Sequence, residues 1–179
     1  MILYRHAPPA VPFLWETPDQ PPGRWHGDAE GPVQYLADTP DGAWAEFLRH
    51  EGITTADQLN GVARAIWAVE VPVETIDAAT RPTLPRETLV GNPETYEACR
   101  HEARRIRRAA APALRTPTAA LVAGGAHGWR VEAGLRPGSA HDGEVIVLFG
   151  ARPDLVGWPV VERGQPGPEL LDRVRPFNG

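Results

Sequence analysis

The sequence predicts a single α+β domain, residues 1–179, in which a mixed β-sheet is flanked by helices. Three observations lead to this fold class. The length of 179 residues is that of one domain, strand-like and helix-like patterns are interspersed along the chain, and no repeat or low-complexity linker divides it. With 42% hydrophobic residues the chain can bury a core, and its 18 Gly and 20 Pro residues indicate many turns and short elements.

Two strands and a helix are predicted in the first third of the chain. The strands are residues 2–6 and Val33–Ala37, and a proline-rich irregular loop separates them. The helix begins after Thr39, because threonine suits the N-cap and the next residue is a proline, which suits the first helical position. It runs to about His50 and stops at Gly52, a residue suited to the C-terminal cap.

Further elements follow in the remaining two thirds. Thr55 opens a second helix with the spacing of a capping box. Residues 66–73 predict a strand that lies near a sheet edge or ends there, because Pro72 cannot donate to a ladder. The longest helix begins at Pro93 and ends by Pro112, with an apolar stripe on one face and five arginines on the other. The other predicted segments are a loop at 78–89, strands at 119–123, 129–133 and 145–149, and a last turn at 169–174.

The composition excludes several classes of enzyme. All 18 basic residues are arginine, so mechanisms that need a Schiff-base or general-base lysine are excluded. Ser139 is the only serine and lacks the glycine spacing of a nucleophile elbow. Cys99 is the only cysteine, which excludes an intrachain disulfide and a cysteine-based zinc cluster. The six histidines show no metal-binding spacing, and we expect the protein to need no metal.

Charge and hydropathy limit the partners. The net charge of −5 argues against a nucleic-acid binder. The five arginines on the helix at 93–112 leave three alternatives, of which a solvated face is favoured over an acidic protein partner and over nucleic acid. Nothing resembles a signal peptide, and no apolar run reaches the ~20 residues of a membrane span. We therefore expect a cytoplasmic protein that binds neither nucleic acid nor membrane.

Glu46 is the most informative single residue. Its neighbours on the predicted helix are apolar, and helical geometry puts Ala43 and Phe47 nearest to it. A carboxylate in such a patch is partly buried, and it must then pair with a cation or shift its pKa upward, as carboxylates of active sites often do.

Four other polar residues have ordinary structural explanations when each is taken alone. Arg5 and Arg24 could be surface charges, Tyr35 could belong to the core, and Thr118 could satisfy the backbone locally. Their combination with Glu46 in a set of ordered motifs is what indicates a function. The motifs, in order, are Leu3-Tyr4-Arg5, Gly23-Arg24-Trp25, Tyr35-Leu36-Ala37, Trp44-Ala45-Glu46 and Pro117-Thr118-Ala119.

This set of motifs resembles the RES domain family, which is named for Arg, Glu and Ser. The order and spacing agree through residues 3–50, and residues 145–149 are similar to the closing strand of the family. The resemblance covers nearly the whole chain but is specific in the first third. Two departures stand out: Thr118 replaces the family's serine, and the segment 124–143 is longer and richer in glycine than expected.

The resemblance implies an ADP-ribosyltransferase-like fold and the destruction of NAD, which is a substrate here and not a cofactor. Family members release nicotinamide by hydrolysis or by phosphorolysis, with inorganic phosphate as second substrate, and an Xre-type antitoxin usually covers the active site. Glu46 would stabilise the positive charge that develops on the ribose. Arg5 and Arg24 would clamp the pyrophosphate, Tyr35 would stack on the nicotinamide, and Thr118 would position NAD or Glu46. Arg24, Tyr35 and Glu46 are the predicted catalytic residues.

Two other functions remain open at this point. A RES-like protein whose site has decayed would bind without catalysis, and the exchange of serine for Thr118 makes this alternative credible. An ADP-ribosyltransferase that modifies a macromolecule would use the same fold. The sequence does not distinguish hydrolysis from phosphorolysis, because water and phosphate need no distinct motif.

Overall fold

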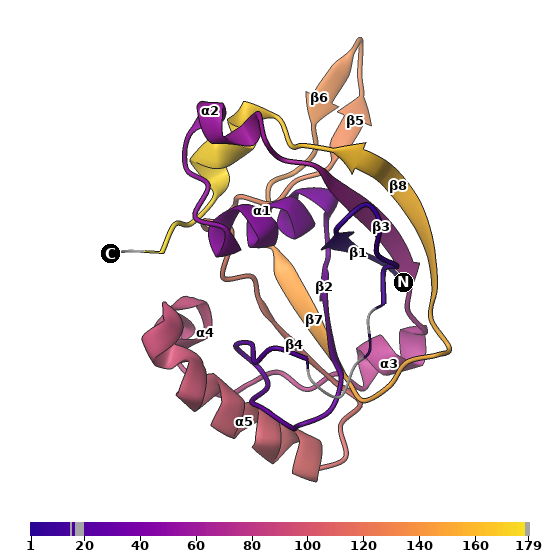
Figure 1. Cartoon of the computed structure of the whole chain (residues 1–179), viewed down its shortest axis with the longest axis vertical. Helices are drawn as coiled ribbons and strands as arrows, with labels where there is room; N and C mark the ends of the chain where they lie inside the picture. The colour runs from indigo at the N-terminus through magenta and orange to yellow at the C-terminus, as the bar shows by residue number, and fades with distance from the viewer. Residues whose placement is uncertain (15, 17–19, 178–179) are drawn as a thin grey trace.

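A six-stranded sheet forms the centre of the computed structural model, which describes residues 1–14, 16 and 20–177 (Figure 1). Every pair of neighbouring strands is antiparallel, and a parallel bridge joins Thr80 to Leu114. The α+β class is confirmed, but the sheet is antiparallel rather than mixed. Its strands, in spatial order, are β4 (Ala113–Pro117), β7 (Glu144–Phe149), β2 (Val33–Ala37), β1 (Ile2–Ala7), β3 (Arg64–Glu70) and β8 (Val156–Gly164).

The structure contains both of the long helices that the sequence predicts. Thr39 caps α1, since its hydroxyl accepts a hydrogen bond from the Gly42 amide at 3.0 Å, and Gly52 follows the helix with a φ of +66°. Among the described residues no helix has the length and apolar character that a bilayer span requires. The helical elements are α1 (Pro40–His50), α2 (Ala56–Leu59), α3 (Val73–Asp77), α4 (Arg86–Val90), η1 (Pro93–Thr95), α5 (Tyr96–Arg108) and η2 (Pro168–Arg173).

Several expected boundaries are wrong because tertiary pairing decided them. β3 ends at Glu70, before Pro72, and lies inside the sheet between β1 and β8. The strand expected at 119–123 is instead β4, which ends at Pro117. A proline is tolerated there because β4 is an edge strand. Residues 78–89, expected as loop, contain the start of α4.

Two strands were not predicted at all. β8 is the second edge strand, and its mostly exposed residues lack the apolar alternation that indicates a half-buried strand. β6 (Leu135–Pro137) pairs with β5 (Trp129–Val131) in a hairpin that projects from the body of the molecule (Figure 1). Both strands of this hairpin are exposed, so no core face marks them in the sequence.

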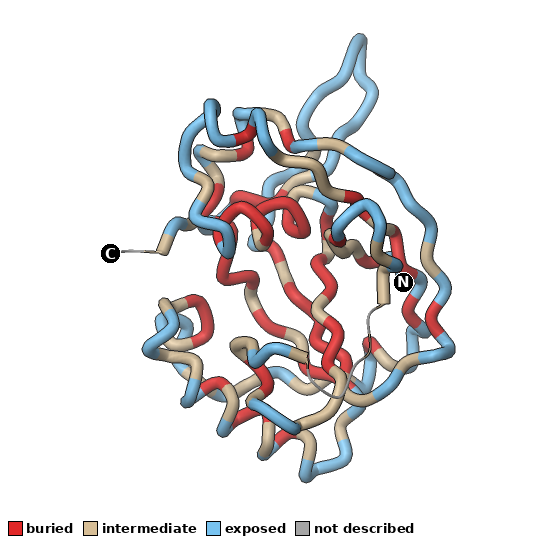
Figure 2. The backbone as a smooth tube through the Cα atoms, in the orientation of Figure 1, coloured by how far each residue is buried: buried red, intermediate tan, exposed pale blue. Residues whose placement is uncertain are grey.

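Both long helices cover the same face of the sheet. Val33, Tyr35 and Ala37 point to this face, because side chains alternate along β2. Ala37 packs in the cluster formed around α1, and Val33 packs in the cluster formed around α5. The opposite face is buried by a third cluster that includes Leu36 and Ile76. The buried segments accordingly gather along the central strands (Figure 2).

The two central strands of the sheet, β1 and β2, pair over only a short length. β1 pairs with β3 along its whole length, from Ile2 to Ala7, and β2 pairs with β7 from Val33 to Ala37. Between β1 and β2, by contrast, Tyr4 pairs with Ala37. The two strands therefore diverge beyond this pair, next to the gap between α1 and α5.

Candidate active site

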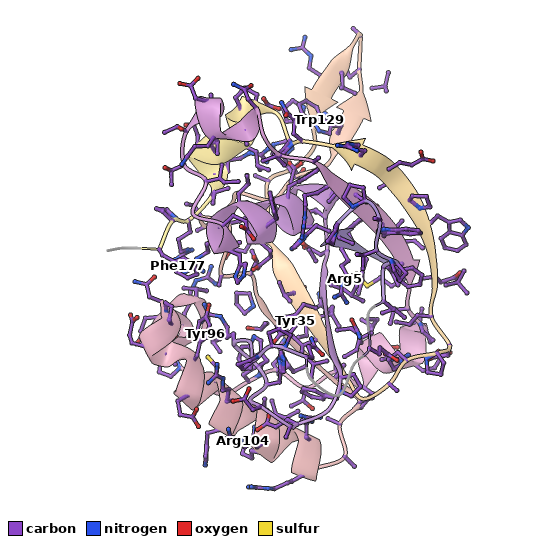
Figure 3. The ribbon with its side chains drawn as sticks, in the orientation of Figure 1. Arg5, Tyr35, Tyr96, Arg104, Trp129 and Phe177 are labelled. Carbon is purple, nitrogen blue, oxygen red and sulfur yellow. The ribbon has the colours of Figure 1, made fainter. Side chains whose placement is uncertain are left out.

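A pocket of about 560 Å³ lies over β2, between α1 and α5. It is where the diverging strands, the loop before β2 and the last described residues of the chain meet (Figure 3). Four of the five predicted site residues line it; the fifth, Thr118, lies directly behind Glu46. The polar and aromatic residues of its lining include Arg5, His6, Arg24, His26, Tyr35, Glu46, Arg49, His50, Tyr96 and Phe177.

Glu46 and Thr118 are in direct contact although 72 positions separate them in the chain. The Thr118 hydroxyl donates to Glu46 Oε1 at 2.7 Å and accepts from the Ala120 amide at 3.1 Å. Because an amide can only donate, the single hydroxyl proton is directed at the carboxylate. Glu46 is half-buried, and the Thr118 hydroxyl is a neutral donor to its carboxylate.

Thr118 is itself held rigidly. Its side chain is buried, and its amide donates to the Gly143 carbonyl at 2.8 Å. A Cβ on Gly143 would lie 2.9 Å from the Thr118 methyl, so this position has no room for a side chain. The orientation of the hydroxyl is therefore set by the backbone at the end of β4 and the start of β7.

Arg24 and Arg49 meet at one backbone oxygen. Arg24 Nη2 donates to the Gly91 carbonyl at 2.6 Å, and Arg49 Nη2 donates to the same oxygen at 3.0 Å. Each guanidinium also lies over an aromatic ring: Arg24 is 4.5 Å from the centroid of Tyr96, and Arg49 is 4.4 Å from that of Phe177. Burial lowers the pKa of Arg49, and the nearby charge of Arg24 adds to this effect. Two cations are thus fixed side by side in the pocket wall.

Arg5 approaches the pocket from another direction. Its Nη1 donates to Gln34 Oε1, so a hydrogen bond bridges β1 and β2 where they diverge. Burial lowers the pKa of Arg5 to about 10, while Glu16 opposes the shift. Figure 3 shows Arg5 and Tyr96 on opposite sides of Tyr35. Arg49, and not Arg5, is the residue that shares an acceptor with Arg24.

Tyr35 holds the loop that carries Arg24. The Trp25 amide donates to the Tyr35 hydroxyl at 2.9 Å, and His26 Nδ1 lies 2.9 Å from the same oxygen. His26 Nε2 is 2.9 Å from the Pro21 carbonyl, which can only accept, so Nε2 carries the proton and Nδ1 accepts from Tyr35. A Cβ on Gly23 would lie 2.7 Å from the Tyr35 oxygen, which explains the glycine before Arg24.

Several of these contacts join residues of different sequence motifs, such as Thr118 with Glu46 and Tyr35 with Trp25. A family model described as RES domain matches residues 2–171. The chain belongs to the RES domain family. A search among curated proteins found no match to this chain. RES domains have the ADP-ribosyltransferase-like fold and are, as a family, NAD-degrading toxins.

The RES domain contains pocket residues that sequence reasoning missed. Arg49 was passed over because an arginine near the end of a helix is usually a favourable surface charge, yet its exposed fraction is 4%. The spacing of the histidines bears only on metal binding and gives no sign that His6 lines the pocket. His26 is also buried and lines the pocket.

Arg64 determines which ring nitrogen of the pocket residue His6 carries the proton. Arg64 Nη2 lies 3.1 Å from His6 Nδ1, and a guanidinium only donates, so Nδ1 is the acceptor. Burial first and the charge of Arg64 second lower the pKa of His6 to about 3. The ring is therefore neutral at ordinary pH, with its proton on Nε2.

Arginines on the basic face of α5 form hydrogen bonds with the loop before β2. Arg100 Nε donates to the Gly23 carbonyl at 2.9 Å, and Arg104 Nε donates to Glu30 Oε1 at 2.6 Å. Arg107 Nη2 donates to the Glu30 carbonyl at 2.6 Å. The expectation of a merely solvated face is therefore wrong for these three arginines, because they attach α5 to the loop that carries Arg24. In the described part of the chain, no cluster of three His, Cys, Asp or Glu residues could hold a metal.

Proposed function

We propose that this RES domain degrades NAD by cleaving the bond between nicotinamide and ribose. The observation that carries the proposal is the Thr118–Glu46 hydrogen bond, which fixes one carboxylate in a pocket whose other charged lining residues are arginines. NAD carries two negative charges on its pyrophosphate and one positive charge on its nicotinamide ring. A pocket with a fixed carboxylate and neighbouring guanidinium groups is complementary to that distribution.

The chemical step needs little from the protein beyond charge and position. When the C–N bond breaks, its electron pair goes to the pyridinium nitrogen, and nicotinamide leaves as a neutral molecule. The ribose carbon becomes electron-deficient, and the Glu46 carboxylate stabilises that charge. Water or inorganic phosphate then forms the new bond to carbon; a proton is released when water attacks.

Arg24 is proposed to hold the pyrophosphate. Its recorded bonds to the Gly91 carbonyl, to Thr95 Oγ1 at 3.2 Å and to the Thr88 carbonyl at 3.5 Å use part of the five N–H donors of a guanidinium. Tyr35 offers its ring to the nicotinamide while its hydroxyl is bonded to the loop. Arg5 is proposed to contact the substrate from the β1 side of the pocket.

The test is loss of NAD with purified protein, measured with and without inorganic phosphate. Hydrolysis releases ADP-ribose in both cases, whereas phosphorolysis requires phosphate and adds it to the ribose. Glu46→Gln keeps the shape of the side chain and removes its charge. We expect it to lower turnover by roughly 100-fold, the scale for loss of one preorganised electrostatic group. A folded Gln variant with wild-type turnover would contradict the proposal.

The biological consequence would be toxicity. Expression in a bacterium should lower cellular NAD and arrest growth, and the Glu46→Gln protein should do neither. We further propose that an Xre-type antitoxin inhibits the protein by covering this pocket, as the family suggests. A decayed, binding-only protein is disfavoured because Thr118 retains the hydroxyl contact to Glu46.

A further inference from the structure

The last described residues of the chain return to the pocket. The Val122 amide donates to the Arg173 carbonyl at 2.9 Å, and the Arg175 amide donates to the Ala120 carbonyl at 2.7 Å. Val174 is buried and forms a bridge with Leu121. This places the segment 173–177 alongside residues 120–122, just beyond Thr118. The segment also lies outside residues 2–171, the part of the chain that the family model matches.

Phe177 brings an aromatic ring to the pocket from this segment. The side chain is half-buried and lines the cavity, while the guanidinium of Arg49 covers one face of its ring at 4.4 Å. Tyr96 stands in the same relation to Arg24. In the view of Figure 3, Phe177 and Tyr96 lie on one side of Tyr35 and Arg5 lies on the other. One end of the pocket thus combines two arginines with two aromatic rings.

The positions of Glu46 and Arg49 along α1 show where the arginines and aromatic rings lie relative to the proposed site of bond cleavage. Glu46 and Arg49 are three residues apart and therefore lie on the same side of the helix. Under the proposed function, Glu46 faces the ribose that bears nicotinamide. The arginine pair beyond it then lies where the pyrophosphate would follow, and Phe177 lies at the arginines. In a dinucleotide, the group beyond the pyrophosphate is the second nucleoside.

We propose that Phe177 stacks on the adenine ring of NAD. The inference rests on the proposed function and extends it to substrate specificity. A phenyl ring has no hydrogen-bonding group, so its contribution is a flat surface for another flat ring. Arg49 holds the phenyl ring in place through its own bonds to the Ala119 and Gly91 carbonyls. Stacking of a base on an aromatic side chain contributes roughly tenfold in affinity.

Binding to the Glu46→Gln protein, in which NAD cleavage is expected to be roughly 100-fold slower, tests the inference directly. Calorimetry compares NAD with nicotinamide mononucleotide, which lacks the adenine half. In this background, Phe177→Ala should weaken NAD binding about tenfold and leave binding of the mononucleotide unchanged. Phe177→Trp should restore NAD binding because it supplies an aromatic face. Trp158→Ala, an exposed aromatic on β8, is the matched control and should change neither affinity.

Each other outcome is decisive. Equal NAD affinity in the Phe177→Ala and parent proteins would overturn the role of Phe177 while leaving the proposed function standing. An equal loss for both ligands would also overturn it, because the ring would then contact the nicotinamide half. Failure of the parent Glu46→Gln protein to bind NAD at all would overturn the proposed function as well. Melting temperatures of all variants separate these results from unfolding.

Discussion

Single side chains in the pocket are oriented by simple rules of donors and acceptors. The hydroxyl of Thr118 has one proton and an amide already occupies one of its lone pairs, so the proton goes to Glu46. The ring of His6 accepts from Arg64 and must therefore carry its proton on the other nitrogen. In both cases a neighbouring group that can only donate decides the orientation.

Thr118 should act through Glu46 and not through the substrate. Thr118→Ser retains the hydroxyl and should keep or raise activity. Thr118→Val has a similar shape without the hydroxyl, and should lower kcat roughly tenfold, because a hydrogen bond to a charged group contributes about 1.5–3 kcal/mol. KM should change little. Steady-state kinetics of the three proteins checks this, and equal kcat values would assign Thr118 to the scaffold alone.

His6 should make the stability of the protein depend on pH. The pKa of His6 is lowered from 6.5 to about 3 by burial first and by Arg64 second. Between these two values the unfolded chain binds a proton that the folded protein does not, so the free energy of unfolding rises with pH from about 3 to 6.5 and this contribution is then constant. His6→Phe should flatten that dependence. Urea unfolding across the range measures it, and an unchanged slope would show that His6 is not the group responsible.

At the scale of elements, α5 acts as a clamp on the loop before β2. Arg100 and Arg107 donate to backbone carbonyls of that loop, and Arg104 pairs with Glu30. Glu30 in turn accepts from the Gly27 amide at 2.9 Å. The loop carries Arg24, so the basic face of the helix positions the pocket without entering it.

Loss of the Glu30 charge should therefore weaken NAD binding, because it loosens the loop that carries Arg24. Glu30→Gln weakens the bonds to Arg104 and Gly27, and should raise KM for NAD several-fold while lowering the melting temperature by a few degrees. Glu94→Gln, an exposed carboxylate in η1, is the control and should change neither. Unchanged KM in the Glu30 variant, measured by NAD turnover, would show that the loop holds Arg24 without the clamp.

At the scale of the molecule, the pocket joins parts of the chain that are otherwise separate. Its walls come from both central strands, both long helices and the segment at 173–177. A ligand that binds this pocket binds the folded protein and not the unfolded chain, so it should stabilise the whole fold.

NAD should consequently raise the melting temperature of the Glu46→Gln protein. At a ligand concentration 100 times the Kd the gain is about 2.7 kcal/mol, which corresponds to roughly 5–10 °C for a chain of this length. Thermal unfolding with increasing NAD measures the shift. Arg24→Lys in the same background should reduce this rise in melting temperature at equal NAD concentration, since lysine lacks the bidentate fork. An identical rise in both proteins would show that Arg24 does not contribute to NAD binding.

Local signals in the sequence determined several features that the structure confirms. The cap at Thr39 and the glycine at 52 set the ends of α1, and the apolar stripe of α5 becomes buried at Cys99, Ala103 and Ile106. These features depend on residues a few positions apart, which is why spacing alone predicts them. The motifs around Glu46 likewise indicate the RES family without reference to any tertiary contact.

Only the tertiary structure decided where the chain pairs over long distances. The divergence of β1 and β2, the edge strand β8, the meeting of Arg24 with Arg49 and the arrival of Phe177 each join segments far apart in sequence. The physical reason is that the acceptor shared by the two arginines is a backbone carbonyl, that of Gly91, which every residue type possesses. The position of such an oxygen depends on the path of the folded chain, so it cannot be predicted from the type of residue at that position.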